Sequence, residues 1–396
     1  MAQVCFYFQI HQPYRLRRYS IFDTSFEYFD DEQNAEVCRK VARKCYLPAN
    51  ALLLDMIERN EGRFRFSMSL TGVVLDAFEE YCPEVLDSLH RLNETGCVEF
   101  LAETYYHSLA FLYSRAEFAK QIQMHGEKIF SLFGQQPRVF RNTELVYNNE
   151  LARFAANMGF VGVVCEGVDR LLAGRSPAFL YRPPEMDEPV LLLKNHRLSD
   201  DIAFRFSDRS WPKWPLTAER FAGWVNDING CGYIANLFMD FETLGEHQWA
   251  ETGIFEFLAD LPGKVMHGGG NGFLTVSEAI GDFPTTDEYD VPQLISWADT
   301  ERDLSAWLGN SMQANALAEL YRLESAVLAR GDEQLLHDWR RLGTSDHFYY
   351  MCTKYFADGD VHKYFNPYDS PYDSYINFMN VLDNLRSRLR MSSVAV

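Results

Sequence analysis

The sequence predicts an α/β protein in which a parallel (β/α) barrel is followed by a C-terminal helical region. Strand-like and helix-like segments alternate over the first two-thirds of the 396-residue chain, as they do in parallel βαβ units. The number of strand candidates favours a barrel over an open sheet. Beyond about residue 300 only helical spacing remains. The composition, 47% hydrophobic and 23% charged, is that of a globular protein.

The predicted strands are short apolar runs. The second alternates apolar and polar residues, as a strand does, whereas the last is continuously apolar, as in a strand buried on both faces. In chain order the candidates are Val4–Ile10, Phe64–Leu70, Cys97–Leu101, Val139–Phe140, Phe160–Cys165, Leu191–Lys194 and Tyr233–Met239.

The predicted helices have apolar residues at helical spacing. Gly134 and Gly159 directly follow two of them, where glycine is favoured because it adopts the left-handed conformation that often ends a helix. The change of pattern near residue 300 predicts a barrel domain over 1–295 and a helical domain over 296–396 that contributes to the active site. The helical segments are Leu52–Asn60, Phe78–Leu92, Ala116–Phe133, Asn149–Met158, Asp303–Ser325, Leu335–Leu342 and Tyr375–Leu389.

Charge and cysteine usage exclude several classes of protein. The net charge of −19 disfavours nucleic acid and anionic membranes as partners, because both require a positive surface. The chain begins without a basic, cleavable leader, and no window has the apolar length of a membrane span. The 8 Cys are scattered without a CxxC pair, which argues against zinc and disulfides and predicts a cytoplasmic protein. His267–Asn271 lacks the pattern of a phosphate-binding loop, so we expect no cofactor.

Polar side chains collect where four of the predicted strands end. In a parallel barrel these carboxyl ends lie on one face and carry the functional residues. The four clusters are His11-Gln12-Pro13; Glu99 with Glu103, Tyr105, Tyr106 and His107; Arg141-Asn142-Thr143-Glu144; and Asp240-Phe241-Glu242-Thr243-Leu244-Gly245-Glu246-His247.

Each cluster, taken alone, also has a purely structural interpretation. A histidine before Gln-Pro, such as His11, is often a turn residue, and Asp240 could cap the helix that follows its strand. Capping does not explain Glu144, because glutamate is a poor capping residue. The recurrence of polar clusters at four strand ends therefore favours a functional site.

Paired carboxylates at a barrel mouth suit the hydrolysis of glycosidic bonds. One carboxylic acid protonates the leaving oxygen, while the other carboxylate captures or stabilises the oxocarbenium-like centre. Arg141, three residues before Glu144, would help to keep that carboxylate ionised as the nucleophile. Asp240 directly follows a long apolar strand, where desolvation would keep it protonated as the general acid.

A divalent metal site is the competing interpretation of the same histidines. His11, His107 and His247 with Asp240 could form a site of the polysaccharide-deacetylase kind. The contiguous Asp-Asp and paired-His motifs of such sites are missing from the sequence, and His107 and His247 can equally donate to sugar hydroxyls. We therefore expect no metal in the chemistry.

The clusters, in this order, resemble the conserved regions of glycoside hydrolase family 57, and specifically its α-amylase-like branch. Glu144 stands where that family has its nucleophile, and Asp240 where it has its acid/base. Two departures, Cys97 in place of Gln and Leu244 in place of Phe, remove no chemical group from the mechanism. The matching segments are His11–Pro13, Gly96–His107, Phe140–Asn149, Met239–His247, Trp297–Asn310 and Thr344–Met351.

The resemblance implies an incomplete, seven-stranded (β/α) barrel whose helical domain closes over the active site. It further implies retention through a covalent glucosyl-enzyme on Glu144, with Asp240 as acid/base and no metal. His11, Glu99 and Trp307 would line the subsite for the glucose ring. The substrate-binding residues predicted in full are His11, Glu99, His107, His247, Trp307, Asp346 and His347.

The predicted function is a retaining glycoside hydrolase acting on α-1,4-glucans such as glycogen, starch or malto-oligosaccharides. The short chain favours a compact α-amylase type. Three alternatives stay open at this point: a 4-α-glucanotransferase on the same scaffold, a metal-dependent polysaccharide deacetylase, and a glucan-binding protein with little turnover.

Overall fold

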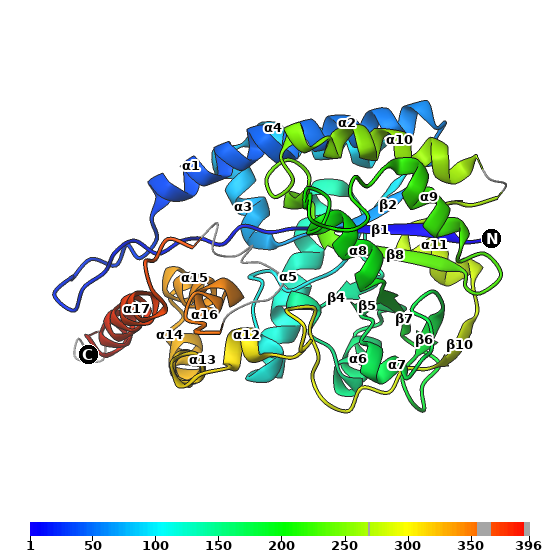
Figure 1. Cartoon of the computed structure of the whole chain (residues 1–396). Coiled ribbons are helices and arrows are strands. Elements are labelled where there is room, and N and C mark those ends of the chain that lie inside the picture. The colour runs from blue at the N-terminus through cyan, green and yellow to red at the C-terminus, as the bar shows by residue number, and fades with distance from the viewer. Residues whose placement is uncertain (268–269, 355–365, 392–396) are drawn as a thin grey trace.

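The computed structural model, which describes residues 1–267, 270–354 and 366–391, is built around two five-stranded sheets (Figure 1). In the first sheet the order is β3-β2-β1-β8, with β9 also paired to β1, and in the second it is β10-β6-β7-β5-β4. The strands are β1 Gln3–Ile10, β2 Phe66–Leu70, β3 Val98–Phe100, β4 Val139–Arg141, β5 Gly162–Glu166, β6 Leu180–Arg182, β7 Val190–Lys194, β8 Ile234–Asp240, β9 Gly272–Phe273 and β10 Thr285–Glu288.

The two sheets combine into an incomplete barrel of seven parallel strands, which confirms the predicted fold class. Strands β1, β2, β3 and β8 form one parallel ladder, and β4, β5 and β7 form the other. A single parallel bridge, Ala102 to Phe140, joins β3 to β4. Between β7 and β8 the backbone N–H of Asn195 donates to the carbonyl of Asn236 at 2.9 Å. Strand β6, antiparallel to β7, and β10 lie outside this ring.

Strand β1 is almost entirely buried because its side chains alternate between two faces and both faces are covered. Phe6 and Phe8 belong to a large apolar cluster that includes residues of α1 to α4 and α10, which pack outside the barrel. Cys5 and Tyr7 point to the other face and share a second cluster with Phe238 and residues of β4, β5 and β7. Because both faces of the strand are covered, an apolar run without solvent-facing positions is the pattern it requires.

The helices cover the barrel and then continue alone after β10 (Figure 1). In chain order they are α1 Asp31–Val41, a π-helical segment Ala42–Tyr46, α2 Leu47–Arg59, α3 Gly72–Tyr81, α4 Pro83–Glu94, α5 Arg115–Phe133, α6 Asn149–Asn157, α7 Asp169–Leu172, α8 His196–Ala203, α9 Ala218–Asn226, α10 Ile254–Met266, α11 Val276–Asp282, α12 Ser305–Leu308, α13 Ser311–Arg322, α14 Glu324–Arg330, α15 Glu333–Leu342, α16 Ser345–Tyr349 and α17 Pro371–Met391.

Two helices predicted as single segments are broken. The helix predicted over Phe78–Leu92 is divided between α3 and α4, because Pro83 has no N–H to continue the first helix and instead begins the second. The segment Asp303–Ser325 contains α12, α13 and the start of α14. Asn310 separates the first two: its side chain accepts from the backbone of Gln313, and the Gln313 side chain accepts from the backbone of Asn310.

The C-terminal helices form their own apolar cluster on one side of the barrel (Figure 1). Trp307, Trp339 and Phe378 lie within this cluster, which also receives Leu16 and Tyr28 from the long loop after β1. No helix in the part of the chain described here is long and apolar enough to cross a bilayer. The domain boundary at residue 295 stays a prediction.

Candidate active site

A pocket lies at the carboxyl end of the barrel, where β1, β4 and β8 end. Two of the predicted carboxylates, Glu144 and Asp240, face it together, and α16 contributes to its wall. Its lining consists of Gln9, His11, Gln12, Pro13, His107, Arg141, Glu144, Asp240, Glu242, His247, Trp297, Asp346 and Tyr350.

Glu144 follows β4 on a tight backbone turn. Glu144 and Leu145 have φ angles of 57° and 50°, in the left-handed region that non-glycine residues rarely adopt. Each such residue costs about 1 to 3 kcal/mol and persists only where its surroundings hold it. Here the backbone N–H of Trp297 donates to the Glu144 carbonyl at 3.3 Å, and buried Leu145 packs in the barrel interior. The turn therefore directs the Glu144 side chain into the pocket.

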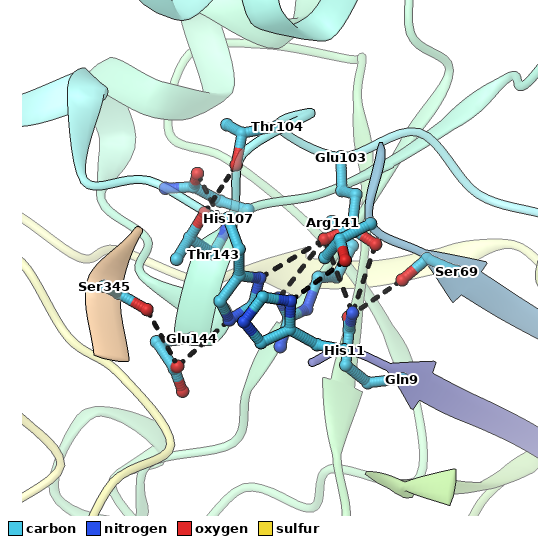
Figure 2. Close-up of polar contacts among 12 residues, drawn as sticks. Gln9, His11, Ser69, Glu103, Thr104, His107, Arg141, Thr143, Glu144 and Ser345 are labelled. Atoms are coloured by element: carbon cyan, nitrogen blue, oxygen red, sulfur yellow. Dashed lines mark hydrogen bonds and ion pairs between the residues drawn. The ribbon is translucent and has the colours of Figure 1, made fainter. Parts of the chain in front are cut away.

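Donors from three separate segments hold the Glu144 carboxylate. The indole Nε1 of Trp297 donates to Oε2 at 2.8 Å. The Nε2 of His107 lies 3.1 Å from Oε1, and the Ser345 hydroxyl donates to the same oxygen at 3.4 Å (Figure 2). Because both oxygens accept hydrogen bonds, the charged form of this buried carboxylate is favoured.

His107 connects Glu144 to a second buried carboxylate, Glu103 (Figure 2). Its Nδ1 lies 3.4 Å from Glu103 Oε2. Burial alone would lower the pKa of His107, but the hydrogen bonds to Glu103 and Glu144 outweigh burial and raise that pKa to about 9. The ring of His11 stacks on His107 with centroids 4.0 Å apart. Burial and the neighbouring His107 lower the pKa of His11, so only one of the two rings is charged at neutral pH.

Asp240 ends β8 and lies beside Glu242. The Asp240 side chain makes no capping hydrogen bond to the 3₁₀ turn Phe241–Thr243, so capping does not account for it. Glu242 is buried and accepts a hydrogen bond of 2.5 Å from the Tyr46 hydroxyl. Burial and the charge of Asp240 raise the pKa of Glu242 to about 8, so Glu242 is protonated at neutral pH. Glu242 is therefore a buried, protonated neighbour of the partly exposed Asp240.

Of the other predicted residues, the structure brings His11, His107, His247 and Asp346 to the pocket. His11 is positioned by Thr71, 2.9 Å from its Nδ1, and by Asp346 Oδ2, 2.9 Å from its Nε2.

Three predicted substrate-binding residues lie outside the pocket lining. Glu99 accepts from the Ser67 hydroxyl at 2.9 Å and from the backbone N–H of Ser277 at 3.0 Å, which directs its carboxylate to the start of α11. Trp307 is fully buried among the C-terminal helices, because it lies on the apolar face of α12. His347 is buried against Phe378, and burial lowers its pKa to about 4.

The sequence alone did not single out the aromatic residue that contacts Glu144. That residue is Trp297, the first of the segment Trp297–Asn310; the sequence predicts Trp307, from the same segment, as a residue of the glucose subsite. Glu103 and Glu242 were visible as polar residues at strand ends, but no local signal distinguished them from the other carboxylates there. Arg141 was predicted as a partner of Glu144, and the structure also places its Nη1 3.8 Å from Glu103 Oε2. Arg141 lies with its Cζ 5.1 Å from the Trp297 ring centroid.

No group of three His, Cys, Asp or Glu side chains within residues 1–267, 270–354 and 366–391 is arranged to hold a metal ion.

Residues 5–292 match the family model described as Glycosyl hydrolase family 57. A protein of Methanocaldococcus jannaschii, named as a candidate α-amylase, is 41% identical over 393 residues, covering 96% of this chain and 83% of that protein. The 4-α-glucanotransferase of Thermococcus litoralis matches with a TM-score of 0.68 at 16% identity, over 96% of this chain and 60% of that enzyme. A branching enzyme of Pyrococcus horikoshii matches with a TM-score of 0.67 at 16% identity, over 97% of this chain and 88% of that enzyme. These two likenesses show a shared fold.

Proposed function

This chain belongs to glycosyl hydrolase family 57, and on that basis we propose that it hydrolyses α-1,4-glucans with Glu144 as nucleophile and Asp240 as general acid/base. The substrates would be glycogen, starch or malto-oligosaccharides. The single observation that carries the assignment is that both carboxylates line one pocket while their surroundings differ. Glu144 is held by donors on both oxygens, whereas Asp240 lies beside a protonated carboxyl group.

The reaction proceeds by double displacement. The neighbouring carboxyl groups of Asp240 and Glu242 hold one proton between them at neutral pH, and with that proton on Asp240 the reaction begins. Asp240 donates it to the glycosidic oxygen as the bond from that oxygen to the anomeric carbon breaks, and Glu144 forms a bond to that carbon. The shortened chain leaves with the proton. Asp240, now a carboxylate, takes a proton from a water molecule as its oxygen attacks the anomeric carbon, and Glu144 is released. The product therefore has the anomeric configuration of the substrate.

The pocket also supplies groups for binding sugar hydroxyls. Arg141 is fully buried, and its guanidinium nitrogens have no hydrogen-bond partner among the described residues. A sugar hydroxyl in the pocket would satisfy this donor, since a buried polar group without a partner is costly. Trp297 would offer an aromatic surface, and His11, His247 and Asp346 would surround the ring.

Hydrolysis is favoured over transfer by the 41% identical relative, which is named as a candidate α-amylase. A cytoplasmic location remains part of the proposal. It is supported by the eight cysteines, all of them free thiols.

The decisive experiment incubates maltoheptaose with the wild type, Glu144→Gln and Asp240→Asn, and follows products by chromatography and by NMR of the anomeric protons. We expect shorter chains whose new reducing ends first appear as the α-anomer. Glu144→Gln should lose at least about a thousandfold in kcat, because the nucleophile acts in the transition state.

The matched control is Glu117→Gln. Glu117 is a buried carboxylate on α5 that pairs with Arg340 at 2.8 Å, away from the pocket lining. This variant should keep the wild-type product pattern. Products longer than the substrate would indicate a glucanotransferase, and a β-anomer as the first product would indicate inversion. If the wild type left maltoheptaose unchanged, the proposed substrate class would be wrong.

A further inference from the structure

Glu103 is a buried carboxylate next to the active site that does not line the pocket. The side-chain amide of Gln9 donates to its Oε1 at 3.1 Å, and Nη1 of Arg141 lies 3.8 Å from its Oε2. The remaining contact of its carboxylate is with Nδ1 of His107 (Figure 2). A carboxylate enclosed in this way cannot contact substrate, so any effect it has on catalysis must pass through a neighbour.

That neighbour, His107, uses both ring nitrogens on carboxylates. Nδ1 faces Glu103 at 3.4 Å and Nε2 faces Glu144 at 3.1 Å. An imidazole can donate from both nitrogens only when it is doubly protonated. While these bonds are in place, His107 has no ring nitrogen left for a sugar hydroxyl.

We propose that Glu103 is a positioning residue: it keeps His107 doubly protonated, and the charged ring in turn holds the Glu144 carboxylate in place for attack. The inference rests on the proposed role of Glu144 as nucleophile. It goes beyond that role by assigning a function to a carboxylate that neither binds substrate nor exchanges a proton with it.

The reaction itself explains why His107 needs a second carboxylate. Glu144 is an anion before attack, but it becomes a neutral ester in the glycosyl-enzyme, so its pairing with the His107 cation is lost at that stage. A buried cation left without a partner is strongly unfavourable. Glu103 does not react, and it therefore remains the counter-ion of His107 throughout the cycle.

The charged groups around His107 agree with this assignment. His11, stacked on it from the end of β1, has a lowered pKa, and Asp346 lies on the far side of His11. Behind Glu103, the ring of His125 on α5 accepts from the Glu103 backbone N–H at 3.3 Å and donates to the carbonyl of Leu70 at 2.8 Å.

This pattern of one accepting and one donating nitrogen is that of a neutral ring, and burial lowers the pKa of His125 accordingly. The buried charged groups around Glu103 are therefore two cations, His107 and Arg141, and two anions, Glu103 and Glu144.

The test combines ¹⁵N NMR of the histidine rings with pH profiles of maltoheptaose cleavage for the wild type, Glu103→Gln and Glu103→Asp. The His107 signals are assigned by their loss in His107→Gln. In the wild type we expect both ring nitrogens to be protonated at pH 7.5 and to titrate near pH 9.

In Glu103→Gln the His107 titration should move down by at least about one unit. Because Glu242 beside the general acid also titrates near pH 8, the kinetic readout is the ratio of the variant kcat to the wild-type kcat, which should fall above the new His107 pKa. Between the new and the wild-type His107 pKa this ratio should fall about tenfold per pH unit, while KM changes little. Glu103→Asp should restore part of the shift.

Glu117→Gln is again the control, because it removes a buried carboxylate of another ion pair and its kcat ratio to the wild type should not change with pH. A neutral His107 in the wild type at pH 7.5 would overturn the proposal even if Glu103→Gln failed to fold. So would a ratio of the Glu103→Gln kcat to the wild-type kcat that does not change with pH. Full activity in Glu144→Gln would instead remove the nucleophile assignment, whatever state the NMR shows for His107.

Discussion

Two tryptophans ten residues apart have different environments, and only one can act on the nucleophile. Trp297 donates its indole N–H to Glu144 Oε2 at 2.8 Å and lines the pocket. Trp307 has none of its surface exposed and packs 6.1 Å from Tyr349, centroid to centroid. The sequence places both in one segment, and the direction of each side chain depends on how that segment folds onto the barrel.

Replacing each tryptophan by phenylalanine separates these roles. In Trp297→Phe a ring remains but the N–H donor to Glu144 is lost, so we expect kcat to fall about 10- to 100-fold, the worth of a hydrogen bond to a charged group. In Trp307→Phe we expect kcat near the wild type and a free energy of unfolding lower by about 1 to 3 kcal/mol, because the cavity lies in the core. Steady-state kinetics and denaturant unfolding measure the two effects. The reverse pattern would contradict the role of Trp297 and favour the predicted role of Trp307 in the glucose subsite.

At the scale of elements, the loop after β8 is shaped by the π-helical segment Ala42–Tyr46. Tyr46 donates to Glu242, and the thiol of Cys45 donates to the carbonyl of Phe241 at 3.3 Å. Glu246, whose side chain is fully buried, pairs with Lys40 at 3.0 Å. One extra residue in a helical turn, as in a π-helix, redirects the side chains beyond it. Here Cys45 and Tyr46, the last two residues of the π-helical segment, contact the loop that carries Asp240 and Glu242.

Gly245 shows how closely these two elements approach. Its φ is +102°, and a Cβ at this position would overlap the backbone oxygen of Lys44. We expect Gly245→Ala to lower the free energy of unfolding by at least about 1 kcal/mol and to lower kcat, because the loop beside Asp240 must move.

Gly126 provides the control, because it lies inside α5 and a Cβ added there would meet nothing within 4 Å. Gly126→Ala should raise the free energy of unfolding by up to about 1 kcal/mol without changing kcat. Calorimetry and kinetics on the same preparations test both variants. Wild-type stability and kcat in Gly245→Ala would show that the loop tolerates the displacement.

At the scale of the whole molecule, the C-terminal helices complete a site that the barrel begins. Ser345 and Asp346 on α16 contact Glu144 and His11 across the pocket. The buried pair between Glu117 on α5 and Arg340 on α15, with atoms 2.8 and 3.0 Å apart, joins the helices to the barrel. Unfolding of this helical region would therefore remove part of the active site.

This region should be sensitive to acid through His347. Its pKa of about 4 in the folded state lies below the ordinary value of 6.5. The unfolded chain thus binds the proton first, and stability is lost as pH falls from 6.5 towards 4. The loss attributable to His347 is about 2 to 3 kcal/mol. We expect the stability difference between the wild type and His347→Asn to shrink by that amount over this interval.

Thermal unfolding at matched pH values measures the difference and cancels the contributions of other groups. His267→Asn, the same substitution at an exposed histidine, is the control for the substitution itself. A constant difference between the wild type and His347→Asn from pH 6.5 to 4 would contradict a neutral, buried His347.

The sequence by itself determined the fold class, most of the barrel strands, and the two carboxylates proposed for catalysis. It could do so because apolar periodicity records local burial, and because the strand ends of a parallel barrel meet whatever the details of packing. Among the carboxylates at those ends, the resemblance to family 57 singled out Glu144 and Asp240. Tertiary structure alone decided which residues surround those carboxylates. It directed the Trp297 indole to Glu144, buried Trp307 among the C-terminal helices, directed Glu99 to α11, and placed Glu103 behind His107. These outcomes depend on contacts between segments distant in the chain, and no local pattern encodes the direction in which such a side chain points.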